Sequence, residues 1–501
     1  MLYLVLKLLH VLCVVGFLGN ITTGLFWKAH ADRTRDPRVI AHALEGIIGS
    51  DRWFTVPGVI GILVFGIGAA NVGHLPLLRT GWLLWAIVLF VISGVAFMTQ
   101  VGPLQRRLAK VARAGADGGA MDWTTYHALS KRWEFWGGVA LLAIVLWDAF
   151  EVVLLPRRIP RALRLSRLLL KALWILWAVR GRAISDRNRR EDFLGLYALL
   201  SLIVLVVLWA VGLIVGFAAL NWAFGSHLAS AGGHAGFRTD LYMSGTTFFT
   251  LGLGDVSPTS PLARLVTVIE AGTGFGFLAL MLAYVPVLYQ SFSKRETRTT
   301  MLDQWAGSPP TSAVLLRRCF ESRDPGAALN QLLRDWELAA AEILESHLSY
   351  PILAYFRSQH DNQSWLASVG AILDACTLVI AGVEGVDPFQ ARLTFAICRH
   401  ALVDVSQNLG RSAVLKEAER EDPAALQALR DWLAQAGVRL DRSADAEARL
   451  HAPRALYRPY ARALSDQLLM PLPGWLPLGN ARFNWETTAW AKTRPGRTHS
   501  G

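Results

Sequence analysis

Long apolar stretches alternate with short polar segments along the chain as far as Tyr289. Each stretch has about 20 residues or more, the length that an α-helix needs to cross the hydrocarbon core of a bilayer. The stretches are Leu2–Phe26, Phe54–Val72, Trp82–Val101, Phe135–Leu155, Phe193–Leu220 and Leu262–Tyr289. The pattern predicts about six transmembrane helices.

Beyond Lys294 the apolar residues recur at helical spacing among alanine and charged residues. Two apolar stretches remain, Trp365–Ile380 and Leu393–Val405, but they are too short or too interrupted to cross a bilayer and are typical of buried helices. This part of the chain predicts an all-helical domain of roughly two hundred residues, large enough to have its own core.

Composition agrees with a membrane protein, since 53% of the 501 residues are hydrophobic and 19 are tryptophan. The formal net charge of +12 is concentrated beside the predicted helices. Residues 157–190 hold eleven Lys or Arg and one acid, Asp186. By the positive-inside rule this linker lies in the cytoplasm, and so does everything after Ser291.

Arginines alternate with leucine and tryptophan between Arg161 and Arg182. This spacing predicts an amphipathic helix that lies on anionic lipid headgroups, and nucleic acid is not expected as a partner. A voltage-sensor helix is the alternative, because arginine recurs at every third position, at Arg158, Arg161, Arg164 and Arg167. Two prolines interrupt that run and the stretch is too polar to span, which favours the surface helix.

Counting helices backwards from the linker gives a cytoplasmic N-terminus. The loops Lys28–Arg52 and Arg106–Arg132 then lie outside, although together they hold eleven Lys or Arg. This conflicts with the positive-inside rule. Either the N-terminal half departs from the rule, or one of its predicted helices does not span.

Between the last two apolar stretches, residues 246–258 read Thr-Thr-Phe-Phe-Thr-Leu-Gly-Leu-Gly-Asp-Val-Ser-Pro. Irregular backbone at membrane depth is stable only where protein buries it or where it lines a wet cavity. Gly252 and Gly254 can take positive φ at little cost, which lets successive carbonyls point one way. Thr250 adds a hydroxyl acceptor, and Asp255 places a carboxylate at the outer mouth, where it attracts cations.

A short re-entrant helix is predicted over Asp240–Thr250, and its negative C-terminal end favours cations inside the membrane. By itself, Thr-x-Gly-x-Gly-Asp is also the pattern of a plain loop or a phosphate-binding turn. The surrounding order of apolar helix, short helix, glycine-bearing loop and apolar helix favours an ion pore. Phe65-Gly66-Ile67-Gly68 has similar letters, but it lies within an unbroken apolar run, which favours close helix packing.

Residues Phe193–Tyr289 resemble the pore of the potassium channel family, whose filter reads Thr-x-Gly-x-Gly-Asp. The resemblance implies a cation-selective channel that conducts K⁺ passively, with Na⁺ as an alternative ion, through a homotetramer of one-pore subunits. The implied filter residues are Thr250, Leu251, Gly252, Leu253, Gly254 and Asp255. The two leucines stand where valine and tyrosine are usual, so the aromatic contacts that brace the filter are missing and strict selectivity is not implied.

The last apolar stretch carries Gly272, Gly274 and Gly276, with Pro286 further on. Glycine and proline both allow a helix to bend. Potassium channels commonly have a glycine hinge at about this distance after the filter, so these four residues are candidates for a gating hinge. Close packing of small residues between membrane helices is the other interpretation.

The N-terminal part resembles a bacterial family of integral membrane proteins of unknown function. The resemblance rests on Leu-Lys-Leu-Leu-His-Val-Leu near the start and Val-Gly-Pro-Leu-Gln-Arg-Arg-Leu after the third stretch. The two resemblances together imply a bacterial inner-membrane protein. The predicted regions are 1–133 (N-terminal membrane domain), 134–156 (a connecting transmembrane helix), 157–190 (basic linker), 191–292 (pore module) and 293–501 (cytoplasmic helical domain).

Enzymatic activity finds no support in the sequence. There is no Walker motif, nucleophile elbow, metalloprotease helix or dinucleotide-binding glycine loop. No cofactor is expected, and no metal beyond the permeant ion at the filter carbonyls. His347, His360, Asp361 and His400 could form a ligand site, but their spacing favours polar residues of a core or interface. The alternative function is a non-conducting membrane scaffold or sensor derived from a channel pore.

Overall fold

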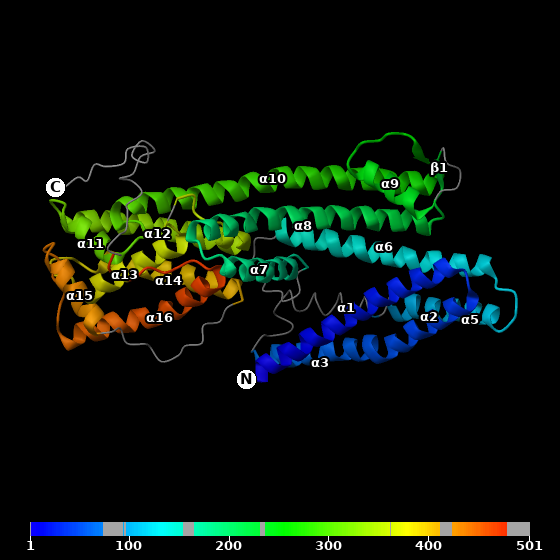
Figure 1. Ribbon diagram of the computed structural model, residues 1–501, viewed down its shortest axis with the longest axis horizontal. Helices are drawn as coiled ribbons and strands as arrows, with labels where there is room; N and C mark the ends of the chain where they lie inside the picture. Colours follow the sequence, from blue (N-terminus) through cyan, green and yellow to red (C-terminus); the bar gives the residue numbers. More distant parts are fainter. Residues whose placement is uncertain are drawn as a thin grey trace. The chain divides into compact units, whose positions relative to one another are not determined.

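The computed structural model describes most of the chain (Figure 1). The described residues are 2–73, 94, 97–153, 165–230, 236–360, 362–410 and 423–477. The chain divides into two compact units, Met1–Trp147 with Trp209–Leu278, and Asp148–Leu208 with Ala279–Gly501. Both are built almost entirely from helices.

The first unit contains the N-terminal helices and the region between the last two predicted spans. Its elements are α1 (Leu2–Thr34), α2 (Pro37–Ser50), η1 (Asp51–Thr55), α3 (Val56–Val72), η2 (Phe97–Val101), α5 (Gly102–Ala116), most of α6 (Trp123–Val153), the end of α8 (Arg187–Ala223), β1 (Leu228–Ser230), α9 (Phe237–Phe248), β2 (Val256–Pro258) and the beginning of α10 (Pro261–Ala306). The second unit contains the remaining parts of α6, α8 and α10 with α7 (Leu165–Ala183), α11 (Ser312–Phe320), α12 (Pro325–Ser349), η3 (Pro351–Tyr355), α13 (Trp365–Gly382), α14 (Phe389–Asn408), α15 (Pro423–Ala434) and α16 (Ala444–Leu468).

Within the described residues, six helices are long and apolar enough to cross a membrane. They are Val5–Thr34, Pro37–Val72, Trp123–Val153, Arg187–Ala223, Pro261–Ala306 and Trp365–Gly382. The first five contain predicted spans, and the all-α membrane fold is confirmed. The predicted span Trp82–Val101 lies largely outside the described residues. In the last helix, α13, 83% of the residues are buried by protein, so it is a core helix of the C-terminal domain, as expected.

Small residues allow α1 and α3 to pack closely. A Cβ atom on Gly66 would lie 2.9 Å from Nδ1 of His10, and a Cβ atom on Gly58 would lie 3.3 Å from that of Phe17. The prediction that Gly66 serves helix packing is therefore confirmed. His10 is satisfied by the neighbouring helix, because its Nδ1 lies 2.9 Å from the carbonyl oxygen of Ile62.

The two basic segments between predicted spans, Lys28–Arg52 and Arg106–Arg132, are mostly helical. Apolar residues at helical spacing on α2 and α5 form a buried cluster with the start of α6. The cluster includes Ile40, Leu44, Leu108, Ala112, Tyr126 and Trp133. Lys28, only 5% exposed, holds α1 to α6 through Ser130 at 2.6 Å and Glu134 at 3.6 Å.

Glycines also bring α6 and α8 into backbone contact. A Cβ atom on Gly138 of α6 would lie 3.1 Å from the carbonyl oxygen of Gly216 of α8, and a Cβ atom on Gly212 would lie 2.8 Å from Val145. Residue numbers rise along α6 as they fall along α8, so the two helices are antiparallel. The cluster of α2 and α5 therefore lies at the end of α8 where the pore segment begins, and the conflict with the positive-inside rule remains.

The second unit has its main core in the C-terminal domain. Leu302 and Ala306 belong to this core, so the last turns of α10 are part of the domain. A second cluster joins α7 to α8, α10 and η3 through Trp174, Tyr197, Tyr284, Leu288 and Leu353. The amphipathic helix predicted over Arg161–Arg182 is observed as α7, while residues 157–164, with three of the four voltage-sensor arginines, lie outside the described part.

The contact between α6 and α8 can be tested with two neighbouring glycines. Gly138→Val should lower the thermal unfolding temperature of the purified protein, because the new side chain has to push α8 away, at a cost of about 1–3 kcal/mol. Gly137→Val is the matched control, since nothing lies within 4 Å of a Cβ atom there. Equal losses in the two variants would contradict the close approach.

Candidate ion-conduction filter

The pore segment is a short helix and an irregular loop held between α8 and α10 (Figure 1). The re-entrant helix predicted over Asp240–Thr250 is observed as α9, Phe237–Phe248. Strands β1 and β2 flank it and pair in antiparallel, with Leu228 opposite Pro258 and Ser230 opposite Val256. This pairing holds the two ends of the pore segment together. The loop after α9 therefore returns to the end of the unit where α9 began.

The backbone of the loop alternates in conformation. φ is +58° at Thr250, +54° at Gly252 and +79° at Gly254, whereas no positive φ occurs at Leu251 or Leu253. Glycine takes this conformation readily, while at Thr250 it is strained. Positive φ at the two glycines is the backbone property that we expected from the sequence.

The start of the loop also closes the end of α9. The N–H groups of Thr250 and Leu251 donate to the carbonyls of Thr247 and Thr246, at 3.0 and 2.8 Å. The C-terminal end of α9, with its partial negative charge, therefore lies next to Thr250.

The side chains of the loop are exposed in the single chain. Leu251 is 62% and Leu253 is 63% exposed, and the structure gives neither of them an aromatic brace. Tyr242 on α9 interacts electrostatically with the carboxylate of Asp255 instead. Sequence analysis missed it, although a helix running inward and a loop running back outward bring the first turns of α9 level with Asp255.

A group of buried polar residues lies behind the filter. Asp240, at the start of α9, accepts a hydrogen bond from Ser226 at 2.6 Å and is fully buried. Glu270 of α10 is fully buried too, beside Ser244, and neither of its oxygens accepts a hydrogen bond from a described residue. Asn221 of α8 is also buried with its amide unpaired within the described residues.

Buried groups of this kind are costly at membrane depth and are often functional. The signal for Glu270 was available in the sequence, since it is the single acid of the stretch Leu262–Tyr289.

The four hinge candidates have different surroundings. A Cβ atom on Gly274 would overlap the carbonyl oxygen of Phe248 at the end of α9, whereas nothing lies within 4 Å of one on Gly272 or Gly276. Gly274 is therefore the point of close contact between α10 and α9. α10 continues unbroken through all of them, including Pro286, and the gating role stays a prediction.

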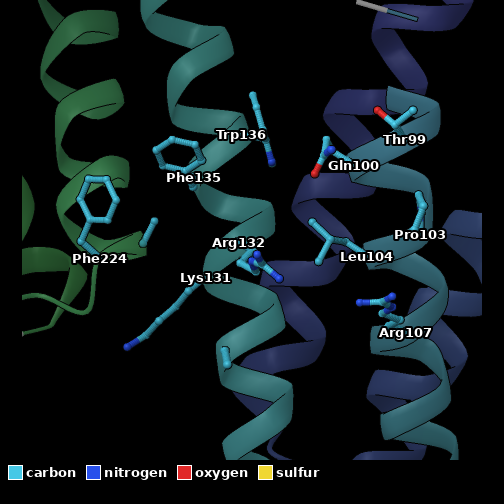
Figure 2. Close-up of a pocket in the computed structure, with 12 residues that line it drawn as sticks. Thr99, Gln100, Pro103, Leu104, Arg107, Lys131, Arg132, Phe135, Trp136 and Phe224 are labelled. Carbon is cyan, nitrogen blue, oxygen red and sulfur yellow. The ribbon is translucent and has the colours of Figure 1, made fainter. Parts of the chain in front are cut away.

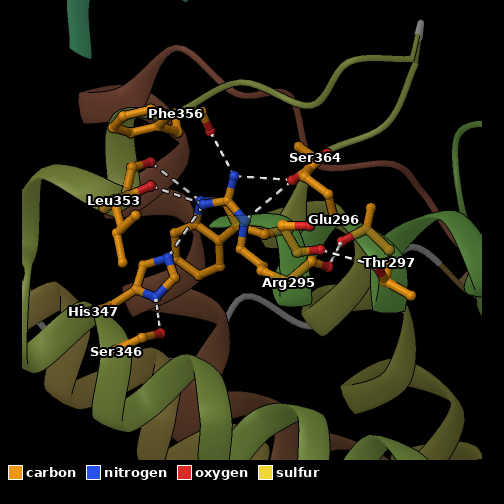
Figure 3. Close-up of polar contacts among 12 residues, drawn as sticks. Arg295, Glu296, Thr297, Ser346, His347, Leu353, Phe356 and Ser364 are labelled. Carbon is orange, nitrogen blue, oxygen red and sulfur yellow. Dashed lines mark hydrogen bonds and ion pairs between the residues drawn. The ribbon is translucent and has the colours of Figure 1, made fainter. Parts of the chain in front are cut away.

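Beyond Pro286, a buried arginine attaches α10 to the C-terminal domain through hydrogen bonds (Figure 3). Arg295 is 3% exposed and donates to the carbonyls of Leu353 at 2.8 Å and Phe356 at 3.0 Å. It pairs with Glu296 at 2.9 Å, and its Nη1 lies 3.3 Å from Nε2 of His347. Movement of this part of α10 therefore engages α12 and η3.

His347 is a buried residue next to Arg295 in this contact. Its Nδ1 lies 2.9 Å from the carbonyl oxygen of Ile343, and its ring centre lies 5.0 Å from that of Trp365, with the two planes tilted by 51°. Burial, together with the adjacent Arg295 guanidinium, holds the pKa of His347 well below its usual range. The structure does not bring it together with His360 or His400, which are exposed, and Asp361 lies outside the described residues. Across the described part of the chain, no three His, Cys, Asp or Glu side chains are grouped to hold a metal ion.

Comparison with known proteins agrees with both resemblances. Residues 202–290 match the family described as ion channel, and residues 4–150 match the family described as predicted integral membrane protein (DUF2269). The uncharacterized membrane protein YdjJ of Bacillus subtilis (strain 168) is 27% identical over 150 residues, which is 30% of this chain. The chain covers 42% of the length of that relative. No solved structure matches.

This chain is therefore a multi-pass membrane protein with an ion-channel region joined to a second membrane region. An ion-channel region points to a role in transport rather than in enzymatic catalysis. The match at residues 4–150 includes nearly all of α6, the helix that packs against α8.

The close contact at Gly274 predicts an asymmetry between adjacent glycines. Gly274→Ala should lower the thermal unfolding temperature, because a methyl group cannot fit beside the Phe248 carbonyl without separating α9 from α10, at a cost of about 1–3 kcal/mol. Gly272→Ala should be close to neutral, since the site is open in the chain. Similar unfolding temperatures for both variants would exclude the backbone contact.

Because the imidazole of His347 is buried and neutral, we expect the stability of the folded protein to depend on pH. The folded chain holds the pKa of His347 below its unfolded value of about 6.5, so the unfolded state takes up the proton first and stability falls as pH drops below about 6.5. The loss should approach about 1.4 kcal/mol per pH unit until the folded pKa is reached. His347→Gln should lack this component, so denaturation at pH 7, 6 and 5 should give the variant a shallower slope. Parallel slopes would show that His347 is not the titrating group.

Proposed function

We propose that this chain is the subunit of a potassium-channel-like, cation-selective channel that conducts passively through a tetrameric pore. The observation that carries the proposal is the alternation of positive φ at Thr250, Gly252 and Gly254 directly after the re-entrant helix α9. An alternating backbone of this kind can present a row of carbonyl oxygens to a dehydrated cation.

Charge supports a cation as the permeant ion. The C-terminal end of α9 carries a partial negative charge and lies beside Thr250, at the inner end of the filter. Asp255 adds a carboxylate at the opposite end of the filter, where four copies would form a ring of acids that concentrates cations. Both features disfavour anions.

The exposed loop supports assembly around an axis. Peptide groups of residues 250–255 have no protein layer over them in the single chain, and such backbone cannot face lipid. Several copies around a wet axis satisfy it, and a single pore segment per chain requires four for a potassium-channel-like filter. Apolar side chains of α10 are exposed as well, such as Val268 and Phe275 at 69% and 67%, although lipid could also cover these.

K⁺ is proposed as the main ion, with Na⁺ as the alternative. Leu251 and Leu253 lack the usual packing behind the filter, so the filter is held less rigidly. A more compliant filter selects by the number and field strength of its carbonyls rather than by close fit. We therefore expect this filter to distinguish K⁺ from Na⁺ less strictly than a braced filter does.

We further propose a location in the bacterial inner membrane with the C-terminal domain in the cytoplasm. α7 of the basic linker supports it, because α7 packs Trp174 and Ala178 against protein while Leu168, Ile175, Leu176 and Val179 stay exposed. Exposed apolar side chains flanked by basic residues fit a helix on anionic headgroups.

Conduction can be tested by expression in a bacterium that lacks its own potassium uptake systems, and by current recordings in liposomes. Wild type should restore growth at low potassium, and Gly252→Ala should abolish it, because alanine at positive φ costs about 1 kcal/mol or more in every copy. Gly236→Ala is the matched control: its φ is −128° and nothing lies within 4 Å of a Cβ atom there.

Membrane expression of all three proteins has to be equal for this comparison. No rescue and no current with wild type would reject conduction and favour the scaffold function. Equal rescue by wild type and Gly252→Ala would reject residues 250–255 as the conducting filter.

A further inference from the structure

The first unit contains a cleft of about 610 Å³ between α5, α6 and the end of α8 (Figure 2). The cleft has three walls: η2 and α5 supply the first, α6 the second, and Ala223 at the end of α8 with the following Phe224 the third. Residues that line it include Gln100, Arg107, Lys131, Arg132, Trp136 and Phe224. None of the residues that line the cleft belongs to the filter loop at residues 250–255.

Positive charge dominates the polar part of the cleft. Arg107, Lys131 and Arg132 line it, and among the described residues no acidic side chain does. In the part of the chain that the structure describes, none of the three forms an ion pair or hydrogen bond, in contrast to Arg113 on the same helix α5, which pairs with Glu45 at 3.1 Å. In Figure 2, Arg107 and Arg132 point toward each other from α5 and α6. Both side chains are exposed, and guanidinium groups are the side-chain groups best suited to bind a phosphate group.

The rest of the cleft is apolar and aromatic. Phe135 and Trp136 follow Arg132 directly on α6, and Phe224 approaches from α8, with its ring centre 5.5 Å from that of Phe135. The apolar stretch of α6 that spans the membrane starts at Phe135. The cations therefore lie at the level of the headgroups, and the aromatic wall lies one step deeper, where tryptophan is favoured.

We propose that this cleft binds an anionic phospholipid, with its phosphate between Arg107 and Arg132 and an acyl chain along Phe135 and Trp136. A free phosphate would share the contact with the guanidinium groups but would leave the aromatic wall uncovered. An amphipathic ligand covers both parts of the cleft, and basic pockets between membrane helices bind acidic lipid headgroups for this reason.

A lipid at this site contacts both membrane regions of the chain. The walls from α5 and α6 lie within the match to the integral membrane family, whereas Ala223 and Phe224 end the outer helix α8 of the channel region. The bound lipid would thus join the two regions at the end of the unit where the pore segment begins. Binding itself does not depend on whether the pore conducts.

The test uses the full-length protein, purified in detergent and depleted of lipid. Dioleoylphosphatidylglycerol is added and the number of lipids retained per chain is counted by native mass spectrometry, with dioleoylphosphatidylcholine in parallel. The double variant Arg107→Gln/Arg132→Gln should retain one phosphatidylglycerol fewer than wild type and bind it roughly thirtyfold more weakly. Arg106→Gln/Lys110→Gln removes the same charge from exposed positions of α5 outside the cleft, and should bind like wild type.

Three outcomes would overturn the proposal. The first is equal retention of phosphatidylglycerol by wild type and the cleft variant. The second is an equal loss in the control variant, which would mean that binding follows overall charge. The third is displacement of the lipid by inorganic phosphate or glycerol 3-phosphate at similar concentration, which would mean that the cleft is a site for free anions. Retained phosphatidylglycerol that these phosphates do not displace would support it.

Discussion

Peptide groups at membrane depth have to find partners, and the arrangement of the pore region follows from this constraint. Residues 250–255 leave the helical hydrogen-bond pattern between two helices that keep it. The structure supports this irregular backbone from one side only, with α9 behind it and with β1 and β2 next to its mouth. The other side is exposed in the single chain. The proposed channel would cover it with ions, water and neighbouring copies.

The same constraint explains how glycine is used elsewhere. At Gly66, Gly138 and Gly274 the missing side chain allows two helices to touch, which provides dispersion contacts that lipid would otherwise supply. The contact at Gly138 matters most for the organisation of the chain, because it attaches the N-terminal membrane region to the outer helix of the channel region. Gly138 therefore places α6 in direct contact with α8.

Much of the fold could be predicted because hydrophobic length is a strong signal. Five spans, the core helix α13 and the re-entrant helix α9 followed from runs of apolar residues and from the break at residues 246–258. The helices within Lys28–Arg52 and Arg106–Arg132 were missed, because their apolar residues are spaced among many charges and become a core only once α2 and α5 face each other.

The site was predictable to a similar degree. Positive φ at Gly252 and Gly254 followed from residue type, while Glu270 and the contact between Tyr242 and Asp255 depend on which helix faces which.

The overlap that a side chain at Gly274 would create shows that the movement of α10 is restricted there. Since backbone touches backbone there, α10 cannot turn about its axis at that level without displacing the carbonyl of Phe248, and with it the base of the filter. In this sense Gly274 keeps α10 against α9 and is not a point at which α10 bends. Gly272 and Gly276 have no such contact with the Phe248 carbonyl, and bending of α10 at these positions or at Pro286 stays a prediction.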